Sequence, residues 1–324
     1  MAVYTEIADE EIQAFAREYD IGRVLACKGI AEGIENSNFL LVSEHGPFIL
    51  TLYERRVRRE DLPFFLALME HLAARGIPCP TPVRGRDGQA LRQLAGRCAA
   101  VVTFLQGMWP RRPTAVHCHA LGQALARMHI AGDDFHMQRN NDLSVQAWRP
   151  LYEASAQRPG AVAPDLAGEL VAELSTLERR WPQDLPRGVI HADLFPDNVF
   201  FEGERLSGLI DFYFACTDFL AYDLGVCLNA WCFEVDGSFN VTKARRFVSG
   251  YTAVRPLAPE ELEALPLLAR GASMRFLMTR LYDWLHTPKN ALVTPKNPME
   301  YLQRLRFHRG ARGLAAYGLG SLDG

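Results

Sequence analysis

The sequence lacks the features that would place a protein in a membrane or outside the cell. No apolar run reaches the roughly 18 residues that a membrane-spanning helix needs. The first residues show no basic segment followed by an apolar core, which is how a secretory signal begins. The seven cysteines are scattered, odd in number and without C-x-x-C spacing, so we expect free thiols in a reducing compartment. Together these absences predict a cytoplasmic protein with no membrane partner.

The sequence also lacks a strong excess of charge of either sign. The formal net charge is −3 over 324 residues, so there is no electrostatic reason to expect nucleic acid as a partner. Hydrophobic residues make up 48% of the chain and charged residues 23%, which are ordinary proportions for a globular protein. The length exceeds one typical domain and suits two lobes. The oligomeric state stays open.

The chain does contain polar residues at fixed spacing within one apolar stretch. His191 is followed by Asp193 and Asn198, and Asp211 comes further along the stretch. Three short apolar segments flank these positions, at 189–190, 199–201 and 206–210. Their strand-like pattern predicts that the polar groups lie where strands end and turns begin, a common place for chemistry on a rigid scaffold.

This spacing suits phosphoryl transfer from a metal-bound nucleotide. The reaction needs a carboxylate that orients the attacking hydroxyl and takes its proton, and oxygen ligands for a Mg²⁺ ion on the phosphates. Asp193 would be the base, and Asn198 and Asp211 would be the metal ligands. The segment fits the H-x-D-L-x-x-x-N pattern of kinase catalytic loops, with Asp211 where the D-F-G aspartate stands. The alternative, turn residues at strand ends, explains each position singly but not the complete spacing.

With Ala221-Tyr222-Asp223-Leu224-Gly225 downstream, the stretch resembles the aminoglycoside phosphotransferase and choline kinase superfamily. Within it, several stretches resemble the type II homoserine kinases: 28–39, 50–54, 191–198, 211–223, 274–276 and 279–283. The resemblance extends over nearly the whole chain. It implies an ATP- and Mg²⁺-dependent kinase that converts L-homoserine to O-phospho-L-homoserine, a step toward threonine.

Two other functions stay open, because composition and spacing alone support only a small-molecule phosphotransferase. The substrate could be another amino alcohol, such as choline or an aminoglycoside, although such cations favour an acidic pocket whereas homoserine also carries a carboxylate. The chain could also be a catalytically idle scaffold that binds nucleotide. The intact Asp193, Asn198 and Asp211 count against that second alternative.

The resemblance implies an α+β, bilobal, protein-kinase-like fold with a small antiparallel-sheet lobe and a larger, mostly helical lobe. We expect the nucleotide-binding lobe over 1–105, because this part is rich in strand patterns and has one principal helix. Residues 106–110 break the pattern and are the predicted hinge. Residues 111–324 are mainly helical and would form the catalytic and substrate lobe.

The nucleotide contacts are expected on the first lobe. In the family interpretation residues 28–38 form the nucleotide loop, where Gly29 and Gly33 let backbone amides approach the phosphates. Taken alone, two glycines in a hairpin indicate no more than a turn. The adenine would lie against hinge backbone groups near Phe104 and Leu105.

One departure from the kinase pattern lies in the third strand. Kinases usually carry a lysine there that neutralises phosphates, and this chain has Thr51. Our hypothesis is that Lys28 supplies the missing charge; the alternative is a solvated turn lysine. In kinases that lysine pairs with a glutamate, for which Glu70 is the candidate here. If Lys28 does not replace the lysine, Glu70 would have lost its partner role too.

Four further residues have more than one interpretation. His191 could be a catalytic acid or, as the family position implies, a structural imidazole that holds the loop. Asp223 could be a metal ligand or, as we expect, a carboxylate that braces loop amides. Arg275 and Arg280 are candidates for binding the homoserine carboxylate, since Arg suits carboxylate geometry. For these two the alternative is a surface ion pair, such as Arg280 with Asp283.

Overall fold

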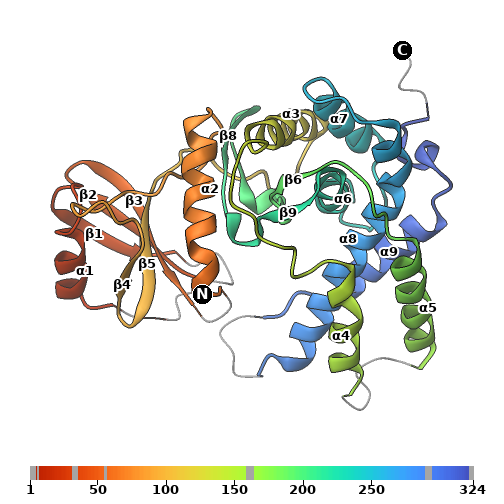
Figure 1. The fold of residues 1–324 in the computed structure, drawn as a ribbon, viewed down its shortest axis with the longest axis horizontal. Coiled ribbons are helices and arrows are strands. Elements are labelled where there is room, and N and C mark those ends of the chain that lie inside the picture. The colour runs from red at the N-terminus through yellow and green to blue at the C-terminus, as the bar shows by residue number, and fades with distance from the viewer. Residues whose placement is uncertain are drawn as a thin grey trace.

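The computed structural model describes residue 5 and residues 7–30, 36–54, 57–157, 164–288 and 294–320. A sheet with two helices lies beside a larger helical part (Figure 1). We call these parts the sheet lobe and the helical lobe. The predicted α+β, bilobal architecture is therefore confirmed.

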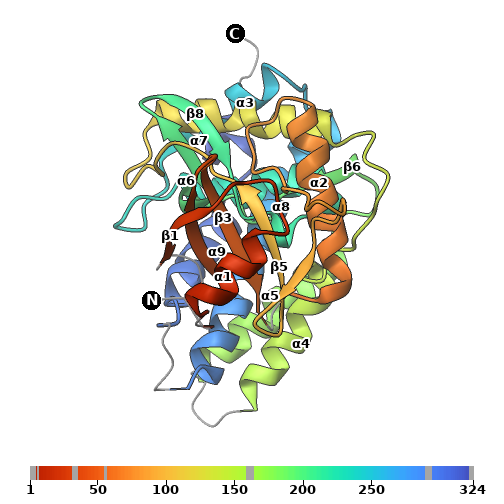
Figure 2. The ribbon, with the colours of Figure 1, turned by 90° about the vertical axis from the view of Figure 1, so that its left-hand side faces the viewer.

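Within the described residues, five antiparallel strands form the main sheet in the order β1-β2-β3-β5-β4. The strands are β1 (Val24–Gly29), β2 (Ser37–Ser43), β3 (Gly46–Tyr53), β4 (Arg92–Leu94) and β5 (Arg97–Thr103). The helix α1 (Asp9–Ala16) covers one face of the sheet, and α2 (Leu62–Ala74) stands between the sheet and the helical lobe (Figure 1). Figure 2 shows α1 in front of the strands when the molecule is viewed from the sheet-lobe side.

The two faces of the sheet follow from the alternation of side chains along each strand. In β3, Leu50 and Leu52 belong to the apolar cluster on the α1 side. Tyr53 belongs to the cluster that contains Phe65 and Met69 of α2. Thr51 has the same parity as Tyr53, so it faces α2 and the cleft between the lobes.

The end of β1 corrects one predicted boundary. Lys28 pairs with Leu40 and Gly29 with Phe39, so these two residues are strand and not the loop that was predicted to begin at residue 28. The cross-strand hydrogen bonds with β2 outweigh the local preference of glycine for a turn. Gly33 lies outside the described residues.

The helical lobe surrounds two short strand pairs. Its helices are α3 (Ala115–Ala131), α4 (Val145–Ala156), α5 (Pro164–Arg180), α6 (Leu220–Trp231), α7 (Val241–Thr252), α8 (Pro259–His286) and α9 (Met299–Gly310). The strands β6 (Arg187–Ile190) and β9 (Cys216–Phe219) pair with each other, as do β7 (Val199–Glu202) and β8 (Arg205–Leu209). Single-turn 3₁₀ helices are η1 (Arg59–Asp61), η2 (Pro196–Asn198), η3 (Phe212–Phe214) and η4 (Leu314–Tyr317). In the part of the chain that is described, no helix combines the length and the apolar character needed to span a membrane.

The helices α3 and α7 cross with their backbones in close contact. A Cβ atom placed on Gly122 of α3 would lie 2.1 Å from the carbonyl oxygen of Phe247 in α7. One placed on Gly250 of α7 would lie 2.2 Å from the carbonyl oxygen of His119 in α3. Only glycine fits at these two positions, so the crossing fixes α3 against the core of the helical lobe.

Candidate active site

The candidate catalytic loop begins where β6 ends. Ala192 has a φ of 64°, a left-handed conformation that costs energy for a residue with a side chain. The loop is held in this shape by Asp223 in the first turn of α6, whose two carboxylate oxygens accept the backbone N–H of His191 at 2.7 Å and of Ala192 at 2.8 Å. Asp223 thus holds the loop in position through these two hydrogen bonds and does not line the cleft.

The buried Asp223 carboxylate is kept ionised by its neighbours. Burial alone would raise its pKa, but the hydrogen bond and charge of His129, together with the His191 backbone amide, hold the pKa below its ordinary value. The Nε2 atom of His129 in α3 lies 3.3 Å from Asp223, and its Nδ1 lies 2.7 Å from the hydroxyl of Tyr251 in α7. The loop is therefore anchored on three helices.

His191 occupies the bracing position that the family resemblance implied. Its Nε2 donates to the carbonyl oxygen of Ile210 at 2.9 Å, and its Nδ1 accepts the backbone N–H of Asp193 at 3.3 Å. These contacts require a neutral imidazole with the proton on Nε2. Burial lowers the pKa of His191, which favours the same neutral form. The ring connects the loop to the strand that leads to Asp211.

The two candidate metal ligands lie beside Asp193. The Asn198 side-chain amide donates to the backbone oxygen of Asp193 at 2.8 Å and lies 3.4 Å from its carboxylate. The backbone N–H of Ile210 donates to the Asn198 carbonyl at 3.0 Å, which places Asp211 next to this residue. Asp211 has a φ of 64°, a turn that directs the chain into η3.

This donor set fits a magnesium ion. The Asn198 NH₂ group is used by Asp193, so its amide oxygen is the atom left to face a cation. That oxygen and the Asp211 carboxylate are hard ligands of the type that Mg²⁺ takes beside nucleotide phosphates. Within the described ranges, no group of three His, Cys, Asp or Glu side chains forms a site of its own. The residues present therefore suit an ion that is shared with a phosphate.

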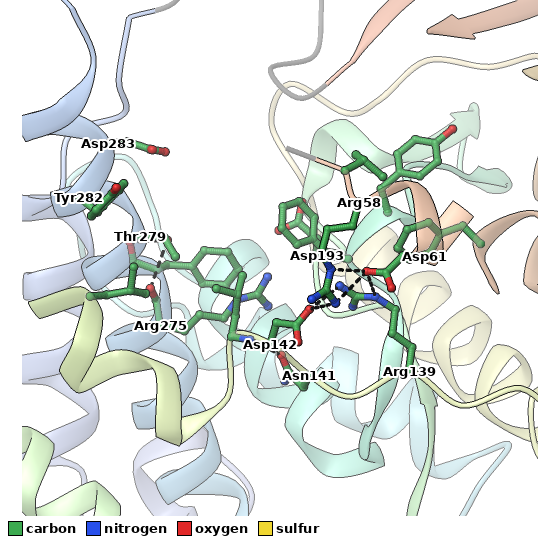
Figure 3. Close-up of a pocket in the computed structure, with 17 residues that line it drawn as sticks. Arg58, Asp61, Arg139, Asn141, Asp142, Asp193, Arg275, Thr279, Tyr282 and Asp283 are labelled. Atoms are coloured by element: carbon green, nitrogen blue, oxygen red, sulfur yellow. Dashed lines mark hydrogen bonds and ion pairs between the residues drawn. The ribbon is translucent and has the colours of Figure 1, made fainter. Parts of the chain in front are cut away.

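The candidate base lines a cleft between the lobes. The cleft has a volume of about 570 Å³ and receives side chains from the segment before α2, from α2 itself, from the segment before α4 and from α8 (Figure 3). Asp193 forms part of its wall together with Arg275, Phe276 and Thr279 of α8. A small molecule in this cleft would lie against the catalytic loop.

The structure separates the two candidate arginines. Arg275 is buried, donates to the backbone oxygen of Ala192 and lines the cleft. Arg280 ion-pairs with Glu300 at 2.8 Å, not with the predicted Asp283, and does not line the cleft. Its guanidinium also stacks on Tyr301. Of the two, only Arg275 joins the residues around Asp193.

The nucleotide candidates lie in the sheet lobe and at its junction with the helical lobe. Thr51 is buried, and its hydroxyl donates to the Asn38 side chain at 2.8 Å. Lys28 lies exposed on β1. Phe104 is exposed and Leu105 is half-buried just after β5. Lys28 and Thr51 thus belong to the strands β1 and β3, and Phe104 and Leu105 to the segment between β5 and α3.

Sequence analysis missed a group of charged residues in the cleft. Arg58 and Asp61 precede α2, whereas Arg139 and Asp142 precede α4, and Figure 3 shows the four side chains joined beside Asp193. No periodicity or motif connects positions so far apart in the chain. The only available indication is the density of charge in Arg58-Arg59-Glu60-Asp61 before a helix.

Comparisons with known proteins agree with this geometry. The sequence matches the model of the phosphotransferase enzyme family over residues 26–257. An amicoumacin kinase has the same fold, with a TM-score of 0.70 at 16% identity over 93% of this chain and 92% of its own. A microcompartment-associated aminopropanol kinase superimposes with a TM-score of 0.67 at 17% identity, covering 94% of this chain and 95% of its own. The fold is thus that of small-molecule phosphotransferases.

Closer relatives narrow the class. A homoserine kinase of Rhodospirillum rubrum is 64% identical over 98% of this chain and 99% of its own length. A homoserine kinase of Paramagnetospirillum magneticum is 62% identical over 98% of this chain and 100% of its own length. The chain belongs to the phosphotransferase enzyme family and, within it, to the homoserine kinases.

Proposed function

We propose that the protein is an ATP-dependent homoserine kinase that forms O-phospho-L-homoserine, a step toward threonine. The observation that carries this proposal is the sequence identity of 60–64% to homoserine kinases over 98% of the chain. The geometry of the catalytic loop supports the reaction class, because Asp193 faces a cleft large enough for an amino acid and the end of a nucleotide.

The reaction would proceed by in-line transfer. The Asp193 carboxylate orients the homoserine hydroxyl and accepts its proton while the hydroxyl oxygen bonds to the γ-phosphorus. The bond between that phosphorus and the bridging oxygen breaks, and ADP leaves. Asn198 and Asp211 would hold Mg²⁺, which when bound neutralises charge on the phosphates. His191 and Asp223 keep the loop in position through the contacts described above.

Substrate recognition would rest on Arg275. Its buried guanidinium lies at the cleft wall, next to the residue that precedes Asp193. A guanidinium at this depth is a suitable partner for the α-carboxylate of homoserine. Arg280 is a weaker candidate because its guanidinium already forms an ion pair with Glu300.

The lobe boundaries are also part of the proposal, with a nucleotide lobe over 1–105, a hinge over 106–110 and a catalytic lobe over 111–324. Met108 exchanges backbone hydrogen bonds with Phe201 at 2.9 and 3.0 Å, which ties the segment to β7. Gly107 has a φ of 126°, and a Cβ there would lie 2.3 Å from the Ser207 hydroxyl. Phe104 and Leu105 would border the adenine, and Gly29 and Gly33 would flank the phosphates.

A kinase for choline or an aminoglycoside is the second candidate, and the cleft argues against it. Three guanidinium groups, those of Arg58, Arg139 and Arg275, line the same space as the acidic side chains. A cationic substrate without a carboxylate favours an acidic pocket, whereas a zwitterion suits mixed charge.

A coupled ADP-release assay over homoserine, choline, serine and an aminoglycoside tests the proposal. We expect a kcat/KM for homoserine at least about a hundredfold above those for choline and the aminoglycoside, because a site built for a charged group rejects analogues that lack it. Serine keeps the carboxylate and is one methylene shorter, so we expect a difference of about tenfold or more for it. Phosphorus NMR of the product would identify the phosphate ester. Equal or higher kcat/KM for choline would overturn the substrate assignment.

A further inference from the structure

The helix α2 lacks the tie that holds its counterpart in protein kinases, where a third-strand lysine pairs with a helix glutamate. Thr51 replaces the lysine and is engaged with Asn38. Glu70 of α2 forms an ion pair with Arg84 at 2.7 Å instead, away from the cleft. The sheet lobe therefore does not fix α2 through this pair.

An interlobe ring of charge stands at the start of α2 instead. We define the interlobe ring as Arg58 and Asp61 of the sheet lobe with Arg139 and Asp142 of the helical lobe. Asp61 accepts from Arg58 at 3.1 Å and from Arg139 at 2.8 Å. Asp142 accepts from Arg58 at 2.8 Å and from Arg139 at 2.9 Å. Each carboxylate thus bridges two guanidinium groups, and Figure 3 shows the ring closing one side of the cleft.

The members of the ring differ in exposure. The side chains of Asp61 and Arg139 are only 13% and 15% exposed, whereas those of Arg58 and Asp142 are 53% and 46% exposed. Water and salt screen the outer pair more strongly than the inner pair. The Asp61–Arg139 contact is therefore the part of the ring that holds the lobes together most effectively.

Arg139 also reaches the segment that follows the candidate metal ligand. Its guanidinium donates to the carbonyl oxygen of Ala215 at 3.3 Å, just beyond η3, and lies 5.3 Å from the Phe65 ring of α2. Its own carbonyl accepts the N–H of Thr217 at 2.6 Å. One side chain thus contacts α2, the Asp211 segment and the inner carboxylate of the ring.

The other end of α2 is fastened to the same lobe. His71 and Arg75 both contact Asp134, just after α3, and His71 lies 2.9 Å from the carbonyl oxygen of Ala131. The helix is consequently held at both ends by the helical lobe, which explains its place between the lobes in Figure 1.

We propose that Arg139 is a positioning residue for the phosphoryl transfer, because with Asp61 it fixes α2 and the arrangement of the two lobes around the cleft. The expected effect of Arg139 on kinetics rests on the proposed kinase function, whereas its expected effect on the arrangement of the lobes does not. In protein kinases the lysine–glutamate pair holds the helix from within one lobe. Here the interlobe ring holds α2 by a contact between the two lobes.

The test is a double-mutant cycle with Arg139→Gln and Asp61→Asn, because a cycle separates the pair from the packing of either residue. Each single variant should lower kcat/KM for homoserine and for Mg·ATP at least about tenfold, since small displacements of reacting groups are costly. The double variant should be no worse than the single ones. Arg149→Gln is the matched control, because it removes an ion pair of 2.7 Å with Glu178 inside the helical lobe.

Small-angle X-ray scattering of the same proteins measures the lobes without any turnover. We expect a larger radius of gyration for both single variants and for the wild type in high salt, and no change for Arg149→Gln. Additive losses in the cycle, or wild-type scattering and kinetics in both single variants, would overturn the proposal. If Arg139→Gln does not fold, Arg139→Lys and the salt titration of the wild type decide it. Absence of homoserine turnover would refute the proposed function and leave the scattering test standing.

Discussion

The hydroxyl groups of Tyr213 and Tyr53 lie 3.4 Å apart, and their rings meet edge to face with centroids 5.3 Å apart. Tyr213 stands where the D-F-G motif has glycine, and Thr51, which stands where the lysine would be, also interacts with its hydroxyl. Burial raises the pKa of Tyr213 to about 12, so the hydroxyl stays protonated. The two departures from the kinase pattern thus meet across the lobe boundary.

Replacing Asp193 with Asn should remove most turnover and leave ATP binding intact. The change keeps the size of the side chain but removes the proton acceptor, and loss of a positioned base typically costs about 10²–10⁴ in rate. Steady-state kinetics with homoserine, beside a nucleotide-binding titration, measure both effects. A rate within threefold of the wild type would show that another group takes the proton.

Replacing Asp211 with Ala should abolish Mg²⁺-dependent nucleotide binding, whereas Asn198→Ala should weaken it less. The carboxylate supplies a full negative charge to the ion and the amide oxygen supplies only a dipole. Titration calorimetry of Mg·ATP and of ATP with chelator separates the metal contribution. Both variants binding Mg·ATP as tightly as the wild type would place the metal ligands elsewhere.

Replacing Arg275 with Ala should raise the KM for homoserine and spare the KM for ATP. The effect should vanish with 3-aminopropan-1-ol, which lacks the carboxylate that the guanidinium would bind. Arg280→Ala is the control, because its ion pair with Glu300 lies away from the cleft. An unchanged KM for homoserine in Arg275→Ala would leave Arg275 with a structural role, through its hydrogen bond to Ala192 and its contacts with the Phe214 and Phe276 rings.

Replacing Lys28 with Met should raise the KM for ATP and lower kcat if its ammonium reaches the phosphates from β1. Replacing Thr51 with Val should change turnover little but lower the free energy of unfolding by about 1 kcal/mol, because the buried hydrogen bond to Asn38 is lost. Kinetics and urea unfolding of the two variants distinguish these outcomes. Wild-type kinetics in Lys28→Met would show that Lys28 is a solvated lysine.

The stability of the protein should fall below about pH 6.5 because of His308. Burial, aided by the charges of Arg304 and Arg270, lowers the pKa of this residue to about 3. The unfolded chain takes up a proton below about pH 6.5 that the folded chain does not accept until about pH 3, so stability is complete above this window and declines as the pH falls through it.

Urea midpoints measured from pH 8 to pH 4 test this pH dependence. His308→Gln should start from a lower midpoint, because contacts with Tyr317 at 2.7 Å and Asn229 at 3.1 Å are disturbed, and should then lose less with acid. His45→Gln, at an exposed site, is the control variant. The same slope in His308→Gln and the wild type would assign the acid sensitivity to other groups.

The catalytic loop was predictable because its information is local. His191, Asp193 and Asn198 fall within one short stretch, and the apolar segments beside them form the strand pairs β6–β9 and β7–β8. The fold class was predictable for the same reason, since the strand-rich and helical parts are separate in sequence. The roles of the site residues stay predictions that the variants above test.

The rest depended on contacts between distant parts of the chain. Arg139 meets Asp61 across 78 positions, and no local pattern marks either residue. The loop boundary at Lys28 was misplaced because strand pairing with β2, and not the adjacent glycine, decides its conformation. The contact between Tyr213 and Tyr53 joins residues 160 positions apart, so it could be seen only with the two lobes placed together.

The crossing of α3 and α7 at Gly122 and Gly250 has a consequence for how this sequence can vary. An added methyl group at either position must push the helices apart, since it would meet backbone and not a flexible side chain. The helix α3 carries His129, which contacts the carboxylate that shapes the catalytic loop. Alanine at either glycine should therefore slow the reaction without changing any residue that touches a substrate.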